Sequence, residues 1–269
     1  MGRLLPRKRP ANLLPYVQLA ESRGASMSKL QKVAPGGETP INFRTRTGQV
    51  RRARTRASIL SAAFEVFDAK GVGGATVEDM RERAGLARGS FYNYFQTYED
   101  MLKELAAQIA RQINAEQSER FENFPNAAER LWSYVRYSIL RAASDRACAE
   151  VLLRVTPLVG SLTDQMRSHA EREIRRSVQG GAIDVPSQSI ALDLGLGLTT
   201  VMLRRALDTR IERREIEAAG LMLLRAYKLE EPEAVRISRL RMPKMPEIPL
   251  REAVLAHFAV RTASSLAKL

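Results

Sequence analysis

The chain of 269 residues has few of the residue types that build metal centres, disulfides and membrane spans. It holds one cysteine, Cys148, and two histidines, His169 and His257. A lone cysteine excludes a disulfide or a thiolate cluster within one chain. No stretch approaches the roughly 18 consecutive apolar residues of a membrane span, and the N-terminus lacks the apolar core of a secretory signal. We therefore expect a cytoplasmic protein with no metal, no cofactor and no membrane partner.

Sequence signatures of catalysis are missing as well. We find no nucleophile elbow, no HExxH, no phosphate loop and no carboxylate pair in a convincing context. Gly195-x-Gly197 lacks the third glycine and the preceding strand of a dinucleotide fingerprint. The sequence therefore predicts that the protein is not an enzyme, and hydrolysis or transfer by the purified protein would revive that class.

Positive charge is what the chain has in excess. Residues 1–60 hold 13 Lys and Arg against two Asp and Glu, which is most of the net charge of +13. A basic excess beside a folded domain indicates a polyanion, most often nucleic acid; a solvated basic tail is the alternative. Residues 1–50 have the Pro- and Gly-rich composition of a disordered arm, in which Met27 is a second candidate start.

Beyond residue 50, apolar residues recur at helical spacing without an alternating strand pattern, which predicts an all-α fold. Gly71 is expected to end the first helix, and Thr76 and Thr97 to cap later ones, because an acid follows each threonine by three residues. The first four expected helices span residues 54–70, 76–84, 88–94 and 97–118.

The second and third of these helices are joined by a tight turn at Gly85, the arrangement of a helix-turn-helix pair. Its expected small core consists of Val77, Met80, Ala84, Leu86 and Phe91. The outward residues are Arg88, Gly89, Ser90, Tyr92, Asn93 and Tyr94. Arginine can bond guanine edges, asparagine can bond adenine, and the hydroxyls can hold phosphates.

The run from Thr76 to Phe95 resembles the DNA-binding domain of the TetR family of bacterial transcriptional regulators. Residues 57–67 and 99–102 fit the family's pattern too, so the resemblance covers about residues 51–105. Its most distinctive part is the cluster Phe91-Tyr92-x-Tyr94-Phe95. The resemblance implies a three-helix DNA-binding domain over residues 51–113, followed by a helical ligand-sensing and dimerisation domain over residues 114–230.

Carried over by position, the resemblance implies a phosphate anchor, base-reading residues and backbone contacts. The upstream arginines would add phosphate or minor-groove contacts. The expected DNA-binding residues are Arg51, Arg52, Arg54, Arg56, Thr76, Arg88, Ser90, Tyr92, Asn93, Tyr94 and Tyr98. Two departures weaken the match: Tyr98 stands where a phosphate-binding lysine is usual, and Ala87 removes a common side-chain cap at about 1 kcal/mol.

The second domain is expected to hold five helices, at about 126–143, 145–155, 161–179, 187–208 and 212–229. A mostly apolar effector pocket would be lined by Trp132, Tyr137, Leu152, Met166, His169 and Met202, unless these are ordinary core residues. A homodimer interface would use Leu194, Gly195, Gly197, Leu198, Leu221 and Leu224, unless these are buried in their own subunit.

Residues 231–269 exceed the usual end of the fold, and their prolines suggest an irregular strap before an amphipathic helix over 250–266. The segment could dock on its own subunit or on the partner, or it could be a read-through artefact. The sequence as a whole predicts a homodimeric regulator, more often a repressor, that binds a palindromic double-stranded operator and is released by a small, mostly apolar effector. The alternative is a family member that has lost DNA reading and acts as a protein-binding co-regulator.

Overall fold

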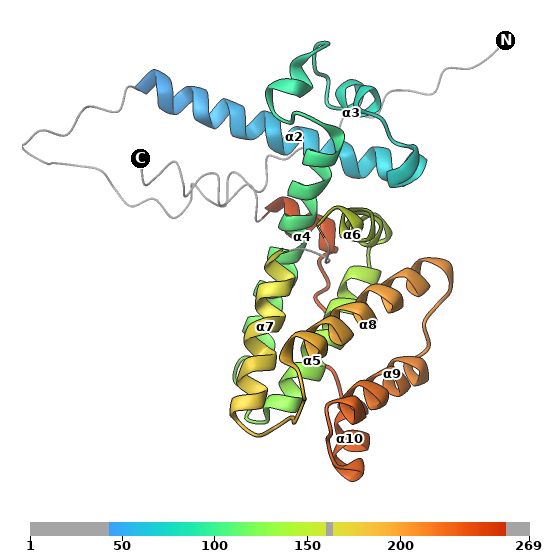
Figure 1. Cartoon of the computed structure of the whole chain (residues 1–269). Helices are drawn as coiled ribbons and strands as arrows, with labels where there is room; N and C mark the ends of the chain where they lie inside the picture. The colour runs from blue at the N-terminus through green and yellow to red at the C-terminus, as the bar shows by residue number, and fades with distance from the viewer. Residues whose placement is uncertain (1–42, 160–163, 257–269) are drawn as a thin grey trace, which may run out of the picture. The chain divides into compact units, whose positions relative to one another are not determined.

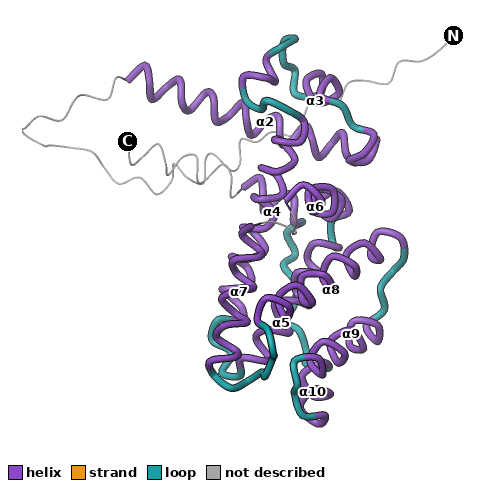
Figure 2. Tube along the Cα trace, viewed as in Figure 1, coloured by secondary structure: helices purple, strands orange, loops and turns teal. Residues whose placement is uncertain are grey.

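The computed structural model describes residues 43–159 and 164–256, and every regular element within these ranges is helical (Figure 2). The elements are α2 (Phe43–Gly74), α3 (Val77–Arg83), η1 (Ser90–Asn93), α4 (Tyr98–Phe121), α5 (Ala127–Ala143), α6 (Arg146–Val159), α7 (Asp164–Gln179), α8 (Gln188–Asp208), α9 (Arg213–Ala226) and α10 (Glu231–Ser238). The predicted all-α fold is confirmed. None of the described helices combines the length and apolarity needed to cross a membrane.

Helix α2 starts earlier than the sequence pattern predicted. It spans Phe43–Gly74, so the expected boundary at residue 50 falls inside a helix. The last proline of the basic arm is Pro40, and residues 43–50 contain no proline and a single glycine, Gly48, so nothing strong opposes helix there. The break at Gly71 is confirmed: its φ of 70° and ψ of 163° interrupt the helix.

The predicted caps are present at the next two helices. Thr76 accepts from the backbone N–H of Asp79, whose carboxylate accepts from the backbone N–H of Thr76 in return, which completes a capping box. Thr97 caps α4 by accepting from the Asp100 N–H. Helix α4 continues to Phe121, so the expected domain boundary at residue 113 lies within it. Helix α4 therefore follows directly on the head (residues 44–97) and is the first helix of the helical body (residues 98–256), as Figure 1 shows.

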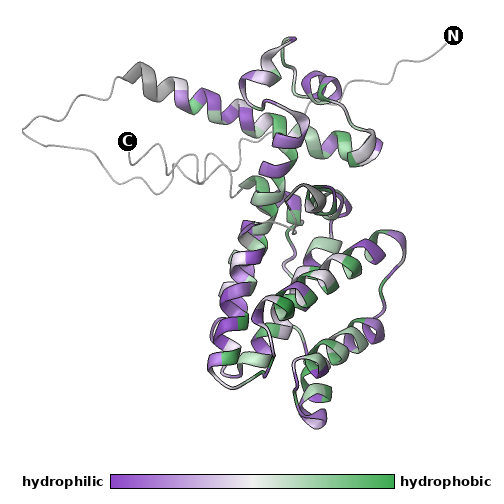
Figure 3. Ribbon diagram, in the orientation of Figure 1, coloured by the Kyte–Doolittle hydropathy of each residue, from purple (hydrophilic) through white to green (hydrophobic). Residues whose placement is uncertain are grey.

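Two clusters of buried side chains hold these elements together. The first joins the head to the body and includes Phe64, Phe91, Leu105 and Leu152. The second lies in the body and is built around Trp132, Ile174, Leu224, Tyr227 and Ile237. Figure 3 shows the hydrophobic positions interleaved with hydrophilic ones along the helices, with α7 the most hydrophilic. The expected helix-turn-helix core is confirmed, with Met80 and Phe91 buried and Val77, Ala84 and Leu86 packed against them.

The C-terminal segment is more regular than the strap that its prolines suggested. Helix α10 occupies Glu231–Ser238, with Pro232 in its first turn, where the missing N–H of proline breaks no helical hydrogen bond. Residues 239–249 are irregular, and helix resumes at Leu250 and is described to residue 256. The rest of the predicted 250–266 helix lies outside the described residues.

Candidate nucleic-acid interface

The turn between α3 and η1 is set by glycine and closed by an arginine. Gly85 has a φ of 67°, the left-handed conformation that the sequence predicted. Arg81 donates from Nη1 to the carbonyl of Leu86 at 2.7 Å and bonds Glu78 through Nε and Nη2 at 2.9 and 2.6 Å. Sequence reasoning missed the role of Arg81, although Glu78 three residues before it was a local signal.

The segment predicted to read bases (residues 88–94, the reading segment) forms a 3₁₀ turn over Ser90–Asn93, whereas the sequence predicted a helix over 88–94. Gly89 has a φ of 86° and no side chain caps the turn, so an α-helical first turn does not form. The N–H of Tyr94 bonds the Phe91 carbonyl at 2.9 Å, the spacing of a 3₁₀ helix. Tyr92 is nevertheless 60% exposed, Arg88 and Asn93 are exposed, and Ser90 and Tyr94 are half-buried.

Two arginines of α2, four residues apart, pack onto the reading segment. Arg52 donates from Nη2 to the Asn93 carbonyl at 3.1 Å. Arg56 donates to the Tyr94 carbonyl at 3.1 Å and from Nε to Glu104 at 2.9 Å, and its guanidinium lies 4.5 Å from the Phe95 ring centroid. Arg56 is therefore engaged within the protein. In this structure it holds the reading segment against α2 and α4, and a contact of Arg56 with DNA stays a prediction.

The remaining basic residues of this face stay open to solvent. Arg51 and Arg54 are exposed on α2. Arg51 and Arg52 border an open depression of about 320 Å³, whose other lining residues are Gly48, Asn93 and Tyr94. The depression thus joins the α2 arginines to the end of the reading segment. Gly48 was missed because it was assigned to the disordered arm.

Two predicted phosphate contacts have partners inside the protein. The Thr76 hydroxyl donates to Asp79 Oδ2 at 2.8 Å as well as accepting from the Asp79 N–H, so a phosphate would have to compete for it. The Tyr98 hydroxyl donates to the Val72 carbonyl at 2.6 Å, and burial raises its pKa to about 12. This hydroxyl ties α4 to the end of α2, so a phosphate would have to displace the Val72 carbonyl for the predicted contact of Tyr98 to form.

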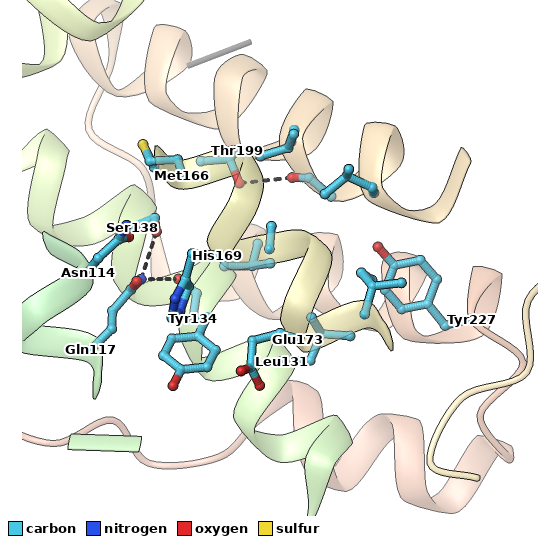
Figure 4. A pocket seen from close by; sticks show the side chains of 16 residues that line it. Asn114, Gln117, Leu131, Tyr134, Ser138, Met166, His169, Glu173, Thr199 and Tyr227 are labelled. Atoms are coloured by element: carbon cyan, nitrogen blue, oxygen red, sulfur yellow. Dashed lines mark hydrogen bonds between the residues drawn. The ribbon is translucent and has the colours of Figure 1, made fainter. Parts of the chain in front are cut away.

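A small cavity of about 50 Å³ lies in the body between α4, α5, α7 and α8 (Figure 4). Of the predicted pocket residues, Met166 and His169 line it. The other four, Trp132, Tyr137, Leu152 and Met202, belong to the packed core, which corrects the expectation for them. The sequence reading missed the polar lining residues Asn114, Gln117, Tyr134 and Ser138. Tyr134 and Ser138, four apart on an otherwise apolar helix face, were a usable signal.

The polar groups of the cavity wall are largely matched within the protein. Gln117 donates from Nε2 to the Tyr134 carbonyl and the Ser138 hydroxyl, each at 2.8 Å, as Figure 4 shows. Glu173 is buried and paired with Arg130 at 2.7 Å. The His169 ring stands edge-on to Tyr134, 4.6 Å between centroids, and burial lowers its pKa. The wall is therefore suited to an uncharged, mostly apolar occupant.

The predicted dimer residues divide by burial. Leu194 is 48% exposed on α8, and Gly197 is exposed with open space beside it. Leu198 and Leu221 are half-buried against the second core cluster. Leu224 has no exposed surface, and a Cβ on Gly195 would lie 3.1 Å from the Tyr227 hydroxyl of the same chain. Gly195 and Leu224 are therefore packed within the subunit, which corrects the expectation for these two.

A surface that displays arginine, asparagine and tyrosine on a glycine-turned helix pair defines a helix-turn-helix DNA-binding protein. Residues 59–105 match the model of the bacterial regulatory proteins of the tetR family. This match identifies residues 59–105 as a DNA-binding domain of the tetR family type, and a helical C-terminal domain follows it.

Solved structures with the same fold are distant in sequence. RolR in complex with resorcinol has a TM-score of 0.58 and 19% identity, and the match covers 73% of this chain and 98% of RolR. FadR from Bacillus subtilis in complex with stearoyl-CoA has a TM-score of 0.52 and 18% identity, with 63% and 96% covered. GusR of Salmonella enterica has a TM-score of 0.52 and 14% identity, with 65% and 96% covered. A search of curated proteins gives no match.

Proposed function

We propose that this regulator is a cytoplasmic homodimeric repressor that binds a palindromic operator and leaves it when a small, mostly apolar effector binds. The observation that carries the proposal is the exposed set Arg88, Tyr92 and Asn93, displayed on a segment that Arg52 and Arg56 fix to α2. A reading surface that its own scaffold already holds in place loses less conformational entropy when it binds DNA.

Within this proposal, Arg88 and Asn93 read base edges, with Ser90 and Tyr92 beside them. Arg51 and Arg54 are exposed on the same head and bind phosphates, each adding about 0.9 to the salt slope of binding. Tyr94 is half-buried next to the basic depression and contributes a backbone contact. This division separates sequence-specific contacts from electrostatic ones, so the two can be tested apart.

The dimer is supported by an apolar stripe on α8 and α9. Ile190, Leu194 and Val201 lie on one face of α8 at helical spacing, 59%, 48% and 58% exposed, and Met222 of α9 is 71% exposed. Exposed apolar residues gathered on adjacent helices indicate an interaction surface. A two-fold axis through this stripe pairs the surface with itself and presents two heads to successive major grooves.

The effector site is the cavity beside His169. At about 50 Å³ it is smaller than the 150 Å³ or so that holds one benzene, so an effector has to widen it. Asn114 and Gln117 of its wall belong to α4, whose first turn is bonded to the head through Tyr98. Widening would therefore shift α4 and the head with it. RolR and FadR, which share the fold, bind resorcinol and stearoyl-CoA.

Selection of bound sequences from a random duplex library tests the DNA proposal. The wild type is expected to yield a palindromic consensus, and Arg88→Ala and Asn93→Ala should lose or degrade specific positions in it. Arg210→Ala, an exposed arginine of the body, is the control and should leave the consensus unchanged. Tight binding without a consensus would contradict the proposal and favour the co-regulator.

The effector proposal has a separate test. Resorcinol, small and uncharged, is expected to raise the thermal midpoint of the wild type and to weaken its hold on the selected duplex. Stearoyl-CoA, large and anionic, should do neither, because the residues that line the cavity include no lysine or arginine and their acid, Glu173, is paired with Arg130. Leu131→Trp, which fills the cavity, should abolish the resorcinol effect. A larger effect of stearoyl-CoA than of resorcinol on the thermal midpoint and on DNA binding would contradict the proposal of a small, uncharged effector.

A further inference from the structure

The segment after α10 is fixed to the body at two buried points. Arg136 of α5 donates from Nη1 to the Leu240 carbonyl at 2.7 Å, and Arg141 of the same helix donates from Nη2 to the Ile248 carbonyl at 3.1 Å. Both arginines are buried, at 6% and 2% exposure. Hydrogen bonds from buried cations to backbone carbonyls are among the stronger ones in proteins, so this irregular stretch has a defined path along α5.

The helical residues that follow are packed into the core that head and body share. Leu250 is fully buried and Val254 is 1% exposed. Both belong to the cluster that contains Phe64 and Phe67 of α2 and Leu152 of α6. Because the two residues are four apart, they present one apolar stripe to that core. The described part of the segment therefore packs where α2 meets the body.

Between these two residues, Arg251 connects body and head directly. Its Nε and Nη2 donate to the two carboxylate oxygens of Asp145 at 2.6 and 2.8 Å, and its Nη1 donates to Asp68 of α2 at 2.5 Å. Its guanidinium also lies 5.6 Å from the Phe64 ring centroid. The Asp145 side chain is 4% exposed, whereas that of Asp68 is 55% exposed. Arg251 is thus anchored in the body and reaches out to the head.

We propose that Arg251 is a positioning residue for the DNA-reading head, which sets the spacing of half-sites that the dimer accepts. The inference rests on the proposed function. In a two-fold dimer, the orientation of each head on its body determines the distance between the two reading segments. A bidentate bond to buried Asp145 leaves little freedom to the guanidinium, so its bond to Asp68 restrains α2 at a fixed point.

Asp68 is exposed and Asp145 is buried, so the head-side bond of Arg251 can be weakened without disturbing its buried ion pair. Asp68→Asn weakens only the head-side bond and keeps the buried pair, so the fold should remain intact. Glu65→Gln is the matched control, because Glu65 is an exposed acid of the same helix whose ion pair, with Arg83 of α3, lies within the head. Both variants remove one exposed negative charge from α2, so their general electrostatic effect on DNA is the same.

Three readouts separate positioning from stability. Asp68→Asn should keep the thermal midpoint of the wild type, bind the duplex selected by the wild type about two- to fivefold less tightly than Glu65→Gln does, and discriminate less against duplexes whose half-sites are moved apart by one base pair. Spin labels at Glu82→Cys of α3 should report a broader head-to-head distance in Asp68→Asn than in Glu65→Gln. Cys148 is fully buried and should not take the label.

Identical spacing discrimination and identical distances in the two variants would overturn the inference while leaving DNA binding intact. A wild type that selects no sequence would instead refute the proposed function, and the head-to-head distance would still decide whether Arg251 restrains the head. A wild type that neither selects a sequence nor forms a dimer would overturn both.

Discussion

Replacing Arg141 with methionine is expected to lower the free energy of unfolding by about 3–5 kcal/mol. Arg141 is 2% exposed, and its Nε and Nη2 donate to the two oxygens of Glu116 on α4, each at 2.9 Å. Without the guanidinium, the buried carboxylate keeps only its bonds from Tyr137 at 2.7 Å and Gln112 at 2.9 Å. Methionine retains most of the apolar stem, so the loss is mainly the uncompensated charge.

Urea denaturation at neutral pH measures this loss. Combining Arg141→Met with Glu116→Gln should recover most of it, because the amide removes the buried charge. Arg213→Met is the control: its ion pair with Glu217 is exposed, with 72% of the arginine side chain open to solvent, and should cost less than about 1 kcal/mol. A loss below about 1 kcal/mol for Arg141→Met, or no recovery in the double variant, would refute the reasoning.

Three further outcomes are expected. Val201→Asp or Met222→Asp places a charge on the exposed stripe and should convert the dimer into monomers in sedimentation equilibrium, without a change in helix content. Burial raises the pKa of Asp145, but its bonds from Arg251 outweigh this, and its pKa is lowered. Its contribution to stability is therefore present above its ordinary pKa and lost as the pH falls through the lowered value. Asp145→Asn should be less stable than the wild type at pH 7, and the difference should shrink in acid. Tyr98→Phe should lower the free energy of unfolding by about 0.5–1.5 kcal/mol and leave the salt slope of DNA binding unchanged. A reduced salt slope would instead show that Tyr98 contacts a phosphate.

Features that depend on neighbouring residues were predictable from the sequence. The caps at Thr76 and Thr97 and the positive φ at Gly71 and Gly85 all follow from side chains within a few positions. The order and approximate extent of the body helices followed from apolar periodicity in the same way. The 3₁₀ turn was missed because Gly89 was weighed as an outward residue and not for its backbone freedom.

Roles that depend on distant contacts could not be predicted. Arg56 had the same signal as Arg54, a basic residue before the helix pair, yet only Arg56 faces Glu104 on α4. Trp132 was expected in the pocket because large aromatic residues line both pockets and cores. Its ring instead packs so closely on Gly220 that a Cβ there would lie 2.3 Å from it. Which face of a helix meets a cavity is decided by packing between helices and not by the helix's own pattern.

The most direct test of the account compares a base-reading residue with a phosphate-binding one. Binding of the wild type, Asn93→Ala and Arg54→Ala to the selected duplex and to a scrambled duplex should be measured over a series of salt concentrations. Asn93→Ala is expected to weaken binding to the selected duplex by on the order of 10-fold or more and to leave the scrambled duplex unaffected. Arg54→Ala should weaken both equally and reduce the salt slope by about 0.9. Equal losses on both duplexes for Asn93→Ala would contradict the claim that this head reads sequence.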